Sequence, residues 1–209
     1  MPRENESLNR QKEVGGLLNQ RIQPASLAFD IDGVFADTMR LFLDIAHDEF
    51  GVDGVRYEDI TCYTLADCID MAPDIIEKVV AKIIDGDYRA PLKPIAGATR
   101  VVASIASRHR PVLFVTARPH LGPMSEWMKS VLPLETDDVE LIATGAFEKK
   151  AEVLLEKRIS YFVEDRLDTC YALEAAGITP VLFKQPWNRE VHPFMEVGSW
   201  KELAAHVAI

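Results

Sequence analysis

The chain has 209 residues, 48% hydrophobic and 27% charged, which is enough for one core with a small inserted subdomain. Its 33 acidic residues outnumber its 23 basic ones, and the net charge of −10 argues against binding to a nucleic-acid polymer. Three cysteines without CxxC spacing predict neither a disulfide framework nor a zinc site.

Residues 1–25 form a polar leader, with a short helix expected around residues 14–20 and ended by Pro24. The leader lacks the apolar segment of a signal peptide, and no apolar run reaches the roughly 18 residues of a membrane span. We therefore expect a cytoplasmic protein that does not associate with a membrane.

The first expected strand is SLAFD, residues 26–30, which is short and mostly apolar like a buried parallel strand. Strands with the same character follow at residues 111–115, 139–143, 161–165 and 179–183. Helical spacing of apolar residues lies between and after them, at residues 97–110, 125–132, 147–158, 168–177 and 200–208. This alternation predicts an α/β fold, a Rossmann-like doubly wound parallel sheet.

The alternation is interrupted once, directly after the first strand. Residues 37–51 and 73–86 have the spacing of amphipathic helices, and PLKPIAG at 91–97 resembles a linker back to the sheet. We therefore expect an α/β core of residues 26–35 and 95–209, with a helical cap subdomain at residues 36–94 inserted into it.

In an open parallel sheet, ligands bind beyond the carboxyl ends of the strands. Acids, a hydroxyl and lysines stand where these ends are expected: Asp30, Asp32 and Gly33 after the first strand, Thr116, Ala117 and Arg118 after the second, Glu164 and Asp165 at the fourth, and Lys149 and Lys150 at a helix start. The sequence therefore predicts one functional site at this edge.

Positions i and i+2 of a strand share a face, so Asp30 and Asp32 are expected to point into one crevice, which Asp165 can complete. Three bare carboxylates would force one of them to stay protonated. A Mg²⁺ ion, which prefers hard oxygen ligands, removes that conflict and would attract a phosphorylated substrate. An EF-hand does not fit, because glycine falls at loop position four and Leu41 at position twelve.

Each of these segments also has a plain structural explanation when taken alone. DIDG can be a strand ending in an Asp-Gly turn, VTAR a strand end with a surface arginine, EKKAEVLLEK a solvated helix face, and VED an acidic turn. Their order along the chain and their shared edge favour a common site.

Together, DIDGV (30–34), LFVTAR (113–118), a lysine at 149 or 150 and VEDRLD (163–168) resemble the motifs of the haloacid dehalogenase-like superfamily of phosphohydrolases, from about residue 26 onward. The resemblance implies that Asp30 is a nucleophile that forms an aspartyl-phosphate. It implies that Asp32 protonates the leaving oxygen and then activates water.

By the same resemblance, Thr116, Ala117 and a lysine bind the phosphoryl oxygens, and Lys150 fits the family pattern better than Lys149. The metal Mg²⁺ would be held by Asp30, Asp165 and the backbone carbonyl of Asp32. An acid at residue 32 favours a phosphatase over a dehalogenase, because halide leaves without a proton, although a phosphomutase has the same two aspartates.

Caps of this superfamily close over the site and choose the leaving group. The aromatic residues Phe35, Phe42, Tyr63 and Trp127 are candidate selectors, with packing as the alternative for each. The stretches DGVFADT and LFKQPWNRE resemble the 5′(3′)-deoxyribonucleotidase branch, which makes a (deoxy)nucleoside monophosphate the leading small phosphorylated substrate.

The remaining candidates for contact with substrate or for support of the metal site are Lys149, Glu164, Asp168, Arg118 and Asn188. Asp37 is expected to be an N-cap or hinge residue of the first cap helix. A sugar-phosphate phosphatase or a phosphomutase is the alternative within the superfamily. Outside the superfamily, a receiver-like signalling module is disfavoured by the helical insert and the DxD spacing. A non-catalytic phosphate- or metal-binding protein is disfavoured by the intact set of Asp30, Asp32, Thr116, Lys150 and Asp165.

Overall fold

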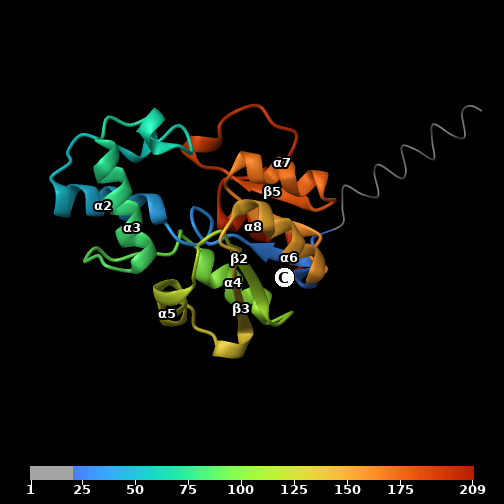
Figure 1. Cartoon of the computed structure of the whole chain (residues 1–209). Helices are drawn as coiled ribbons and strands as arrows, with labels where there is room; N and C mark the ends of the chain where they lie inside the picture. The colour runs from blue at the N-terminus through green and yellow to red at the C-terminus, as the bar shows by residue number, and fades with distance from the viewer. Residues whose placement is uncertain (1–20) are drawn as a thin grey trace, which may run out of the picture.

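The computed structural model describes residues 21–209, so the short helix expected at residues 14–20 lies outside the described residues. Six strands form one parallel sheet in the order β3-β2-β1-β4-β5-β6, which confirms the predicted doubly wound α/β fold (Figure 1). The strands are β1 (Leu27–Phe29), β2 (Val112–Thr116), β3 (Val139–Ala143), β4 (Tyr161–Glu164), β5 (Thr179–Phe183) and β6 (Met195–Val197). The edge strand β6 was not predicted, because only one of its three residues is buried.

Helices cover both faces of the sheet, with α4 and α8 in contact on one face and α6 and α7 in contact on the other. The α-helices are α2 (Thr38–Phe50), α3 (Pro73–Asp85), α4 (Ala98–Ala106), α5 (Gly122–Val131), α6 (Lys150–Glu156), α7 (Leu167–Ala175) and α8 (Trp200–His206). Short 3-10 turns are η1 (Pro24–Ser26), η2 (Tyr57–Asp59), η3 (Leu65–Asp67), η4 (Thr136–Asp138), η5 (Phe147–Lys149) and η6 (Pro186–Asn188). The helix expected at 147–158 is thus a 3-10 turn followed by the shorter α6.

The central strand β1 separates two apolar layers, as the period of two in a strand requires. Phe29 belongs to the larger layer together with Trp200 of α8, whereas Ala28 belongs to the smaller layer under α6 and α7. The rings of Phe29 and Trp200 lie 5.2 Å apart, and the Trp200 indole N–H donates to the carbonyl of Val34 at 2.8 Å. Trp200 therefore fixes the loop that carries the residues after β1.

Residues 36–94 leave the sheet after β1 and return before α4, and their helices α2 and α3 pack against each other beside the sheet (Figure 1). The two connecting segments are joined by backbone hydrogen bonds: the Asp37 N–H donates to Lys93 at 2.9 Å, and the Ile95 N–H donates to Phe35 at 2.8 Å. We call residues 36–94 the insert; this paired neck holds it next to the carboxyl edge of the sheet.

The cysteines and the helix lengths bear on disulfide bonds and on membrane spans. Cys62, Cys68 and Cys170 all carry free thiols, as their spacing predicted. Among residues 21–209, none of the helices has both the length and the apolar character needed to cross a membrane.

Candidate active site

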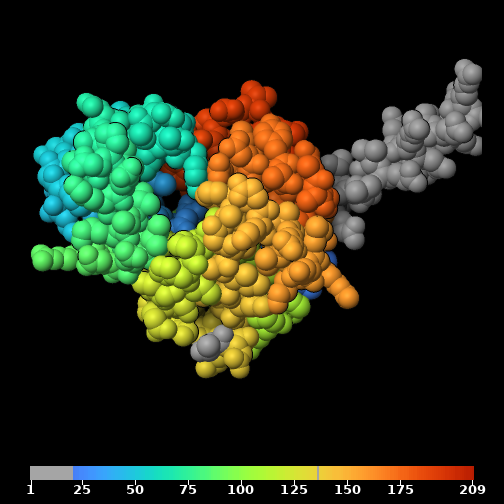
Figure 2. Space-filling view, viewed as in Figure 1, coloured from blue at the N-terminus to red at the C-terminus, as the bar shows by residue number. Residues whose placement is uncertain are grey.

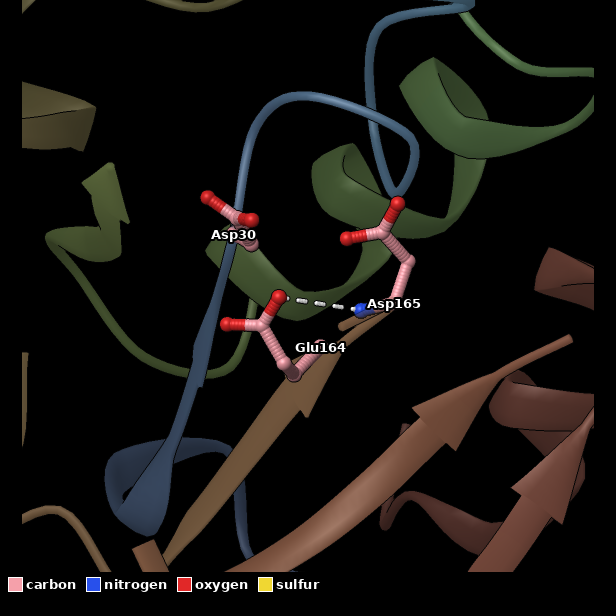
Figure 3. Close-up of side chains that lie close together, drawn as sticks. All are labelled: Asp30, Glu164 and Asp165. Atoms are coloured by element: carbon pink, nitrogen blue, oxygen red, sulfur yellow. Dashed lines mark hydrogen bonds between the residues drawn. The ribbon is translucent and has the colours of Figure 1, made fainter. Parts of the chain in front are cut away.

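Three carboxylates meet where β1 and its neighbour β4 end. Asp30 follows β1, Glu164 is the last residue of β4, and Asp165 follows it, all three buried. One oxygen from each carboxylate lies within 4.8 Å of the others, and Figure 3 shows the three side chains around one space. The predicted neighbours Asp30 and Asp165 therefore lie together, and Glu164 joins them.

Lys150 lies in the same cluster. It is the first residue of α6 and fully buried, and its Nζ lies 3.0 Å from Asp30 Oδ2 and 2.8 Å from Glu164 Oε2. The other oxygen of Glu164 accepts the backbone N–H groups of Asp165 and Arg166, each at 3.1 Å. Lys149, in contrast, is exposed, so the geometry favours Lys150 of the two candidate lysines.

The charges in this cluster are unbalanced. Burial raises the pKa of Asp30 well above its ordinary value; Lys150 lowers it and Glu164 raises it further. Burial, and then the charges of Glu164 and Asp30, likewise raise the pKa of Asp165. Burial alone would lower the pKa of Lys150, but the attraction of Asp30 and Glu164 outweighs it and the pKa is raised. Three carboxylates facing one ammonium form an oxygen-rich donor set that fits a divalent cation such as Mg²⁺.

Asp165 accepts hydrogen bonds from two residues of the segment after β5. The indole N–H of Trp187 donates to Asp165 Oδ2 at 2.9 Å, and the Asn188 amide donates to the Asp165 carbonyl at 2.7 Å and to Phe183 at 2.9 Å. Asn188 therefore supports Asp165 and does not line the cavity described below. Trp187 was missed as a site residue; its only signal in the sequence was the PWN stretch after the last predicted strand.

Gly33 makes room for this arrangement. Its φ is +73°, a left-handed conformation, and an added Cβ would lie 2.0 Å from Asp165 Oδ2 and 3.2 Å from the Trp187 ring. Its carbonyl accepts a hydrogen bond of 2.6 Å from the Gln185 amide. Glycine is required here both by backbone conformation and by the close approach of Asp165.

The Asp32 side chain points away from the three carboxylates. Arg118 donates hydrogen bonds to both of its oxygens, from Nε and Nη2, each at 2.8 Å. The Thr38 hydroxyl also donates to Asp32, at 2.7 Å. Burial would raise the pKa of Asp32, but the charge of Arg118 and hydrogen bonds from Arg118 and Thr38 outweigh it, so the pKa is lowered. The side chain of Asp32 therefore does not join the candidate metal site; the contribution predicted for it there was its backbone carbonyl.

Arg118 is not the surface arginine that a plain strand end would carry, because its side chain is buried. Its third hydrogen bond, from Nη1, reaches the carbonyl of Ile83 in α3 at 3.1 Å. Arg118 thus connects the candidate acid Asp32 to the insert. Neither its burial nor this bond could be deduced from VTAR alone.

A cavity of about 430 Å³ lies between the sheet edge and the insert, and Figure 2 shows the hollow between the cyan and green insert and the core. Asp30, Asp32, Thr116, Ala117 and Arg118 line its core side. The predicted phosphate-binding residues Thr116 and Ala117 therefore face the same space as the two aspartates. Thr116 is buried, and its hydroxyl accepts the Arg118 backbone N–H at 3.2 Å.

The aromatic candidates separate into two pairs. Phe42 and Tyr63 line the cavity. Phe35 is fully buried, with its ring 5.3 Å from Phe114 and 5.7 Å from Trp127, and the Trp127 indole donates to a backbone carbonyl. The prediction that Phe35 or Trp127 selects the substrate is wrong, because both are committed to core packing.

Two predicted acids lie outside the cluster. Asp168 is exposed and pairs with Arg166 at 3.2 Å, so it does not contact the carboxylates. Asp37 is the N-cap residue of α2, as expected, but its side chain pairs with Arg40 at 3.1 Å and does not cap the helix.

Comparison with known families gives a match over nearly all described residues. The sequence model of the family described as 5′ nucleotidase, deoxy (pyrimidine), cytosolic type C protein (NT5C) matches residues 24–208. No curated protein matches the sequence.

Solved structures of hydrolases share the fold. A haloacid dehalogenase-like family hydrolase from Streptococcus pneumoniae has a TM-score of 0.58 at 14% identity, covering 86% of this chain and 96% of its own. A hydrolase of the same superfamily from Ehrlichia chaffeensis has a TM-score of 0.54 at 13% identity, and the match covers 89% of this chain and 97% of that one. One from Deinococcus radiodurans, with bound phosphate and sodium, has a TM-score of 0.52 at 17% identity, and the match covers 88% of this chain and 97% of that one. At these identities the likeness concerns the fold.

Proposed function

The chain belongs to the NT5C family within the haloacid dehalogenase-like hydrolases and is a phosphatase, and from that premise we propose that it hydrolyses (deoxy)nucleoside monophosphates in a Mg²⁺-dependent reaction. The observation that carries the proposal is the placement of Asp30 against Lys150 and beside Asp165, at the floor of a cavity that Asp32 also lines. This arrangement places a nucleophile at the cavity, with a cation for phosphoryl oxygens and a candidate metal site directly beside it.

In the proposed reaction, a carboxylate oxygen of Asp30 attacks phosphorus while the bond from phosphorus to the leaving oxygen breaks. Asp32 gives a proton to that oxygen. Water then attacks the aspartyl-phosphate, Asp32 takes its proton, and phosphate leaves with the Asp30 carboxylate restored. Lys150 and Thr116 would hold the phosphoryl oxygens in line for both steps.

Mg²⁺ would be held by Asp30, Asp165 and the Asp32 carbonyl, and when bound it would neutralise phosphoryl oxygen charge. The carboxyl placement supports this, because Trp187 occupies one oxygen of Asp165 and leaves the other available. Arg118 keeps Asp32 as a carboxylate, the form that the second step needs. For the first step, Asp32 would move away from Arg118 and take up a proton from solvent, which it then gives to the leaving oxygen.

The insert is proposed to act as a cap over the cavity. Besides the Arg118 contact, the hydroxyl of Tyr57 donates to Gln185 Oε1 at 2.7 Å. The ring of Tyr63 lies over the Arg166 guanidinium at 4.6 Å. These contacts link the insert to the core around the cavity, and their release would open it to solvent.

The test is phosphate release from deoxynucleoside and nucleoside monophosphates with Mg²⁺ or with EDTA. Wild type is expected to turn over only with Mg²⁺, and Asp30→Asn to lose roughly 10⁴-fold or more. Asp44→Asn, an exposed change on α2, serves as the control and should retain activity. Turnover by Asp30→Asn at the wild-type rate would rule out the aspartyl-phosphate. Clear preference for sugar phosphates would leave the phosphatase function intact and replace only the nucleotide. Isomerised product would replace hydrolysis with a phosphomutase reaction.

A further inference from the structure

The two sides of the cavity differ in chemistry. The core side carries the two aspartates, Thr116 and Arg118, whereas the insert side is built from apolar side chains: Met39, Phe42, Leu65, Ile76, Val80 and Ile83. Ile76, Val80 and Ile83 stand at i, i+4 and i+7, so one stripe of α3 faces the cavity. Val80 is 38% exposed, so this part of the stripe is open to the cavity.

This apolar stripe is not covered by the contacts that join the insert to the core. The contacts named above are polar or aromatic: Arg118 binds the backbone carbonyl of Ile83 and not its side chain, Tyr57 donates to Gln185, and Tyr63 lies over Arg166. With all three in place, the cavity still has about 430 Å³, within the roughly 300–1,000 Å³ of ligand pockets. Because the stripe faces the space above Asp30 and Asp32, its occupant is the group that phosphorus is attached to.

Few polar groups on the insert side could serve that occupant. Among the described residues that line it, the polar side chains are the hydroxyls of Thr38, Tyr63 and Thr64, and Thr38 is committed to Asp32. The Arg118 guanidinium on the core side is engaged by Asp32 and by the Ile83 carbonyl. A leaving group with many hydroxyls would lose water there without gaining enough hydrogen bonds in return.

We propose, on the basis of the phosphatase function above, that the insert selects the leaving group by apolar contact. The favoured substrates are monophosphates of alcohols with a flat or apolar body, and polyhydroxylated sugar phosphates are excluded. A nucleoside can satisfy this requirement through its base faces. The hydrogen-bonding edge of the base would be read only weakly, because the insert, within residues 36–94, brings hydroxyls but no amide or charged side chain to the cavity.

The test uses two substrates with the same kind of leaving oxygen. Cyclohexylmethyl phosphate and glucose 6-phosphate are both monoesters of a primary alcohol on a six-membered ring, and the hydroxyls are the main difference between the rings. We expect kcat/KM to be at least roughly tenfold higher for cyclohexylmethyl phosphate. Among dUMP, dCMP and dAMP, we expect kcat/KM to differ by less than about tenfold.

Matched variants assign the effect to the insert. Val80→Asn places an amide at a partly exposed position of α3 that lines the cavity. It should reduce the preference for cyclohexylmethyl phosphate over glucose 6-phosphate several-fold. Ala81→Asn introduces the same residue one position along, exposed and outside the cavity lining, and should leave the preference unchanged. Circular dichroism checks that both variants fold.

The outcomes are distinct. Equal or better turnover of glucose 6-phosphate by wild type, an unchanged preference in Val80→Asn, or strong discrimination between dUMP and dCMP would each overturn the apolar selection. In those cases phenyl phosphate would still be hydrolysed and the phosphatase function would stand. Absence of Mg²⁺-dependent turnover of phenyl phosphate and of every other monoester would overturn the proposed function itself.

Discussion

The core side and the insert side of the cavity are constructed differently. On the core side, Asp30 lines the cavity, and ion pairs or hydrogen bonds from neighbouring elements fix it together with Lys150 and Asp165 beside it. On the insert side, residues such as Phe42 and Val80 are placed by helix packing alone, and their side chains face the cavity without polar partners. A bonded network has one arrangement, whereas an apolar wall tolerates change of shape.

This difference predicts how the two sides respond to substitution. Removing one member of the network leaves buried partners without their bonds, so it should affect both turnover and stability. Changing the apolar wall should alter mainly which substrate is accepted. Four substitutions on the core side test this difference.

Lys150→Met should give the largest loss among them. The substitution keeps most of the length of the side chain but leaves Asp30 and Glu164 buried without their cation. We expect kcat to fall roughly 10²–10³-fold, as for loss of one donor to a developing charge. We also expect the metal-free protein to lose about 3–5 kcal/mol of stability. Steady-state kinetics and chemical denaturation measure the two effects.

Lys149→Met is the matched control, because this neighbouring lysine is exposed. It should retain both turnover and stability. If Lys149→Met loses activity and Lys150→Met does not, the assignment of the phosphoryl-binding lysine must be exchanged between them.

Trp187→Phe should weaken metal binding. It removes the N–H that holds Asp165 Oδ2 at 2.9 Å while keeping most of the ring. Residues that orient a metal ligand typically contribute about 10–100-fold in affinity, so the Kd for Mg²⁺ should rise by that factor. Titration calorimetry with Mg²⁺ measures it without any turnover. Trp127→Phe, which removes an indole bond to the Leu92 carbonyl, should leave the Kd unchanged. Equal affinities for all three proteins would contradict the role of Trp187.

Arg118→Gln tests the connection between the two sides. It breaks the bonds to Asp32 and to the Ile83 carbonyl at the end of α3. We expect faster amide hydrogen exchange in the last turn of α3 and a loss of about tenfold in kcat/KM, consistent with charged hydrogen bonds of roughly 1.5–3 kcal/mol. Arg110→Gln, which breaks the ion pair with Asp138 far from the cavity, is the control. Unchanged exchange in α3 would show that Arg118 does not hold the insert.

The sequence was informative about the core side because its signals are local. Short apolar strands followed by acids predicted the sheet and the meeting of Asp30 with Asp165, since parallel strands end at one edge. It left Lys149 and Lys150 unresolved, because adjacent helical residues differ by about 100° in direction and only the packing of α6 decides which is buried.

Contacts between distant segments could not be predicted in the same way. Phe35 follows the catalytic motif directly, yet it packs into the core against Phe114 and Trp127. Arg118 reaches Ile83 and Trp187 reaches Asp165 across the fold, and neither pair shares a local pattern. Such contacts depend on the path of the insert and of the last loop, which hydrophobic periodicity does not specify.

Asp165→Asn should have the smallest effect, and it should be a gain in stability of the metal-free protein where the other substitutions cause a loss. In the folded protein without metal, the pKa values of Asp30 and Asp165 are raised by burial and by the neighbouring carboxylates. A carboxyl whose pKa is raised on folding costs stability when ionised, and this cost grows as pH rises through the folded-state pKa. Asp165→Asn removes one such charge while its amide oxygen can still accept the Trp187 N–H. In EDTA at pH 8, its Tm should therefore exceed that of wild type, by ~2–4 °C for each 1 kcal/mol relieved.

The advantage of Asp165→Asn should disappear as the pH is lowered, because Asp165 of wild type is then protonated and equally uncharged. It should reverse when Mg²⁺ is added, because binding stabilises only a folded protein that retains the ligand. Asp168→Asn, an exposed neighbour that pairs with Arg166, should not change the Tm in either condition. A variant that is less stable than wild type in EDTA at every pH would mean that the three carboxylates do not repel one another. The site would then need no cation to offset their charge, and the metal assignment would lose its physical basis.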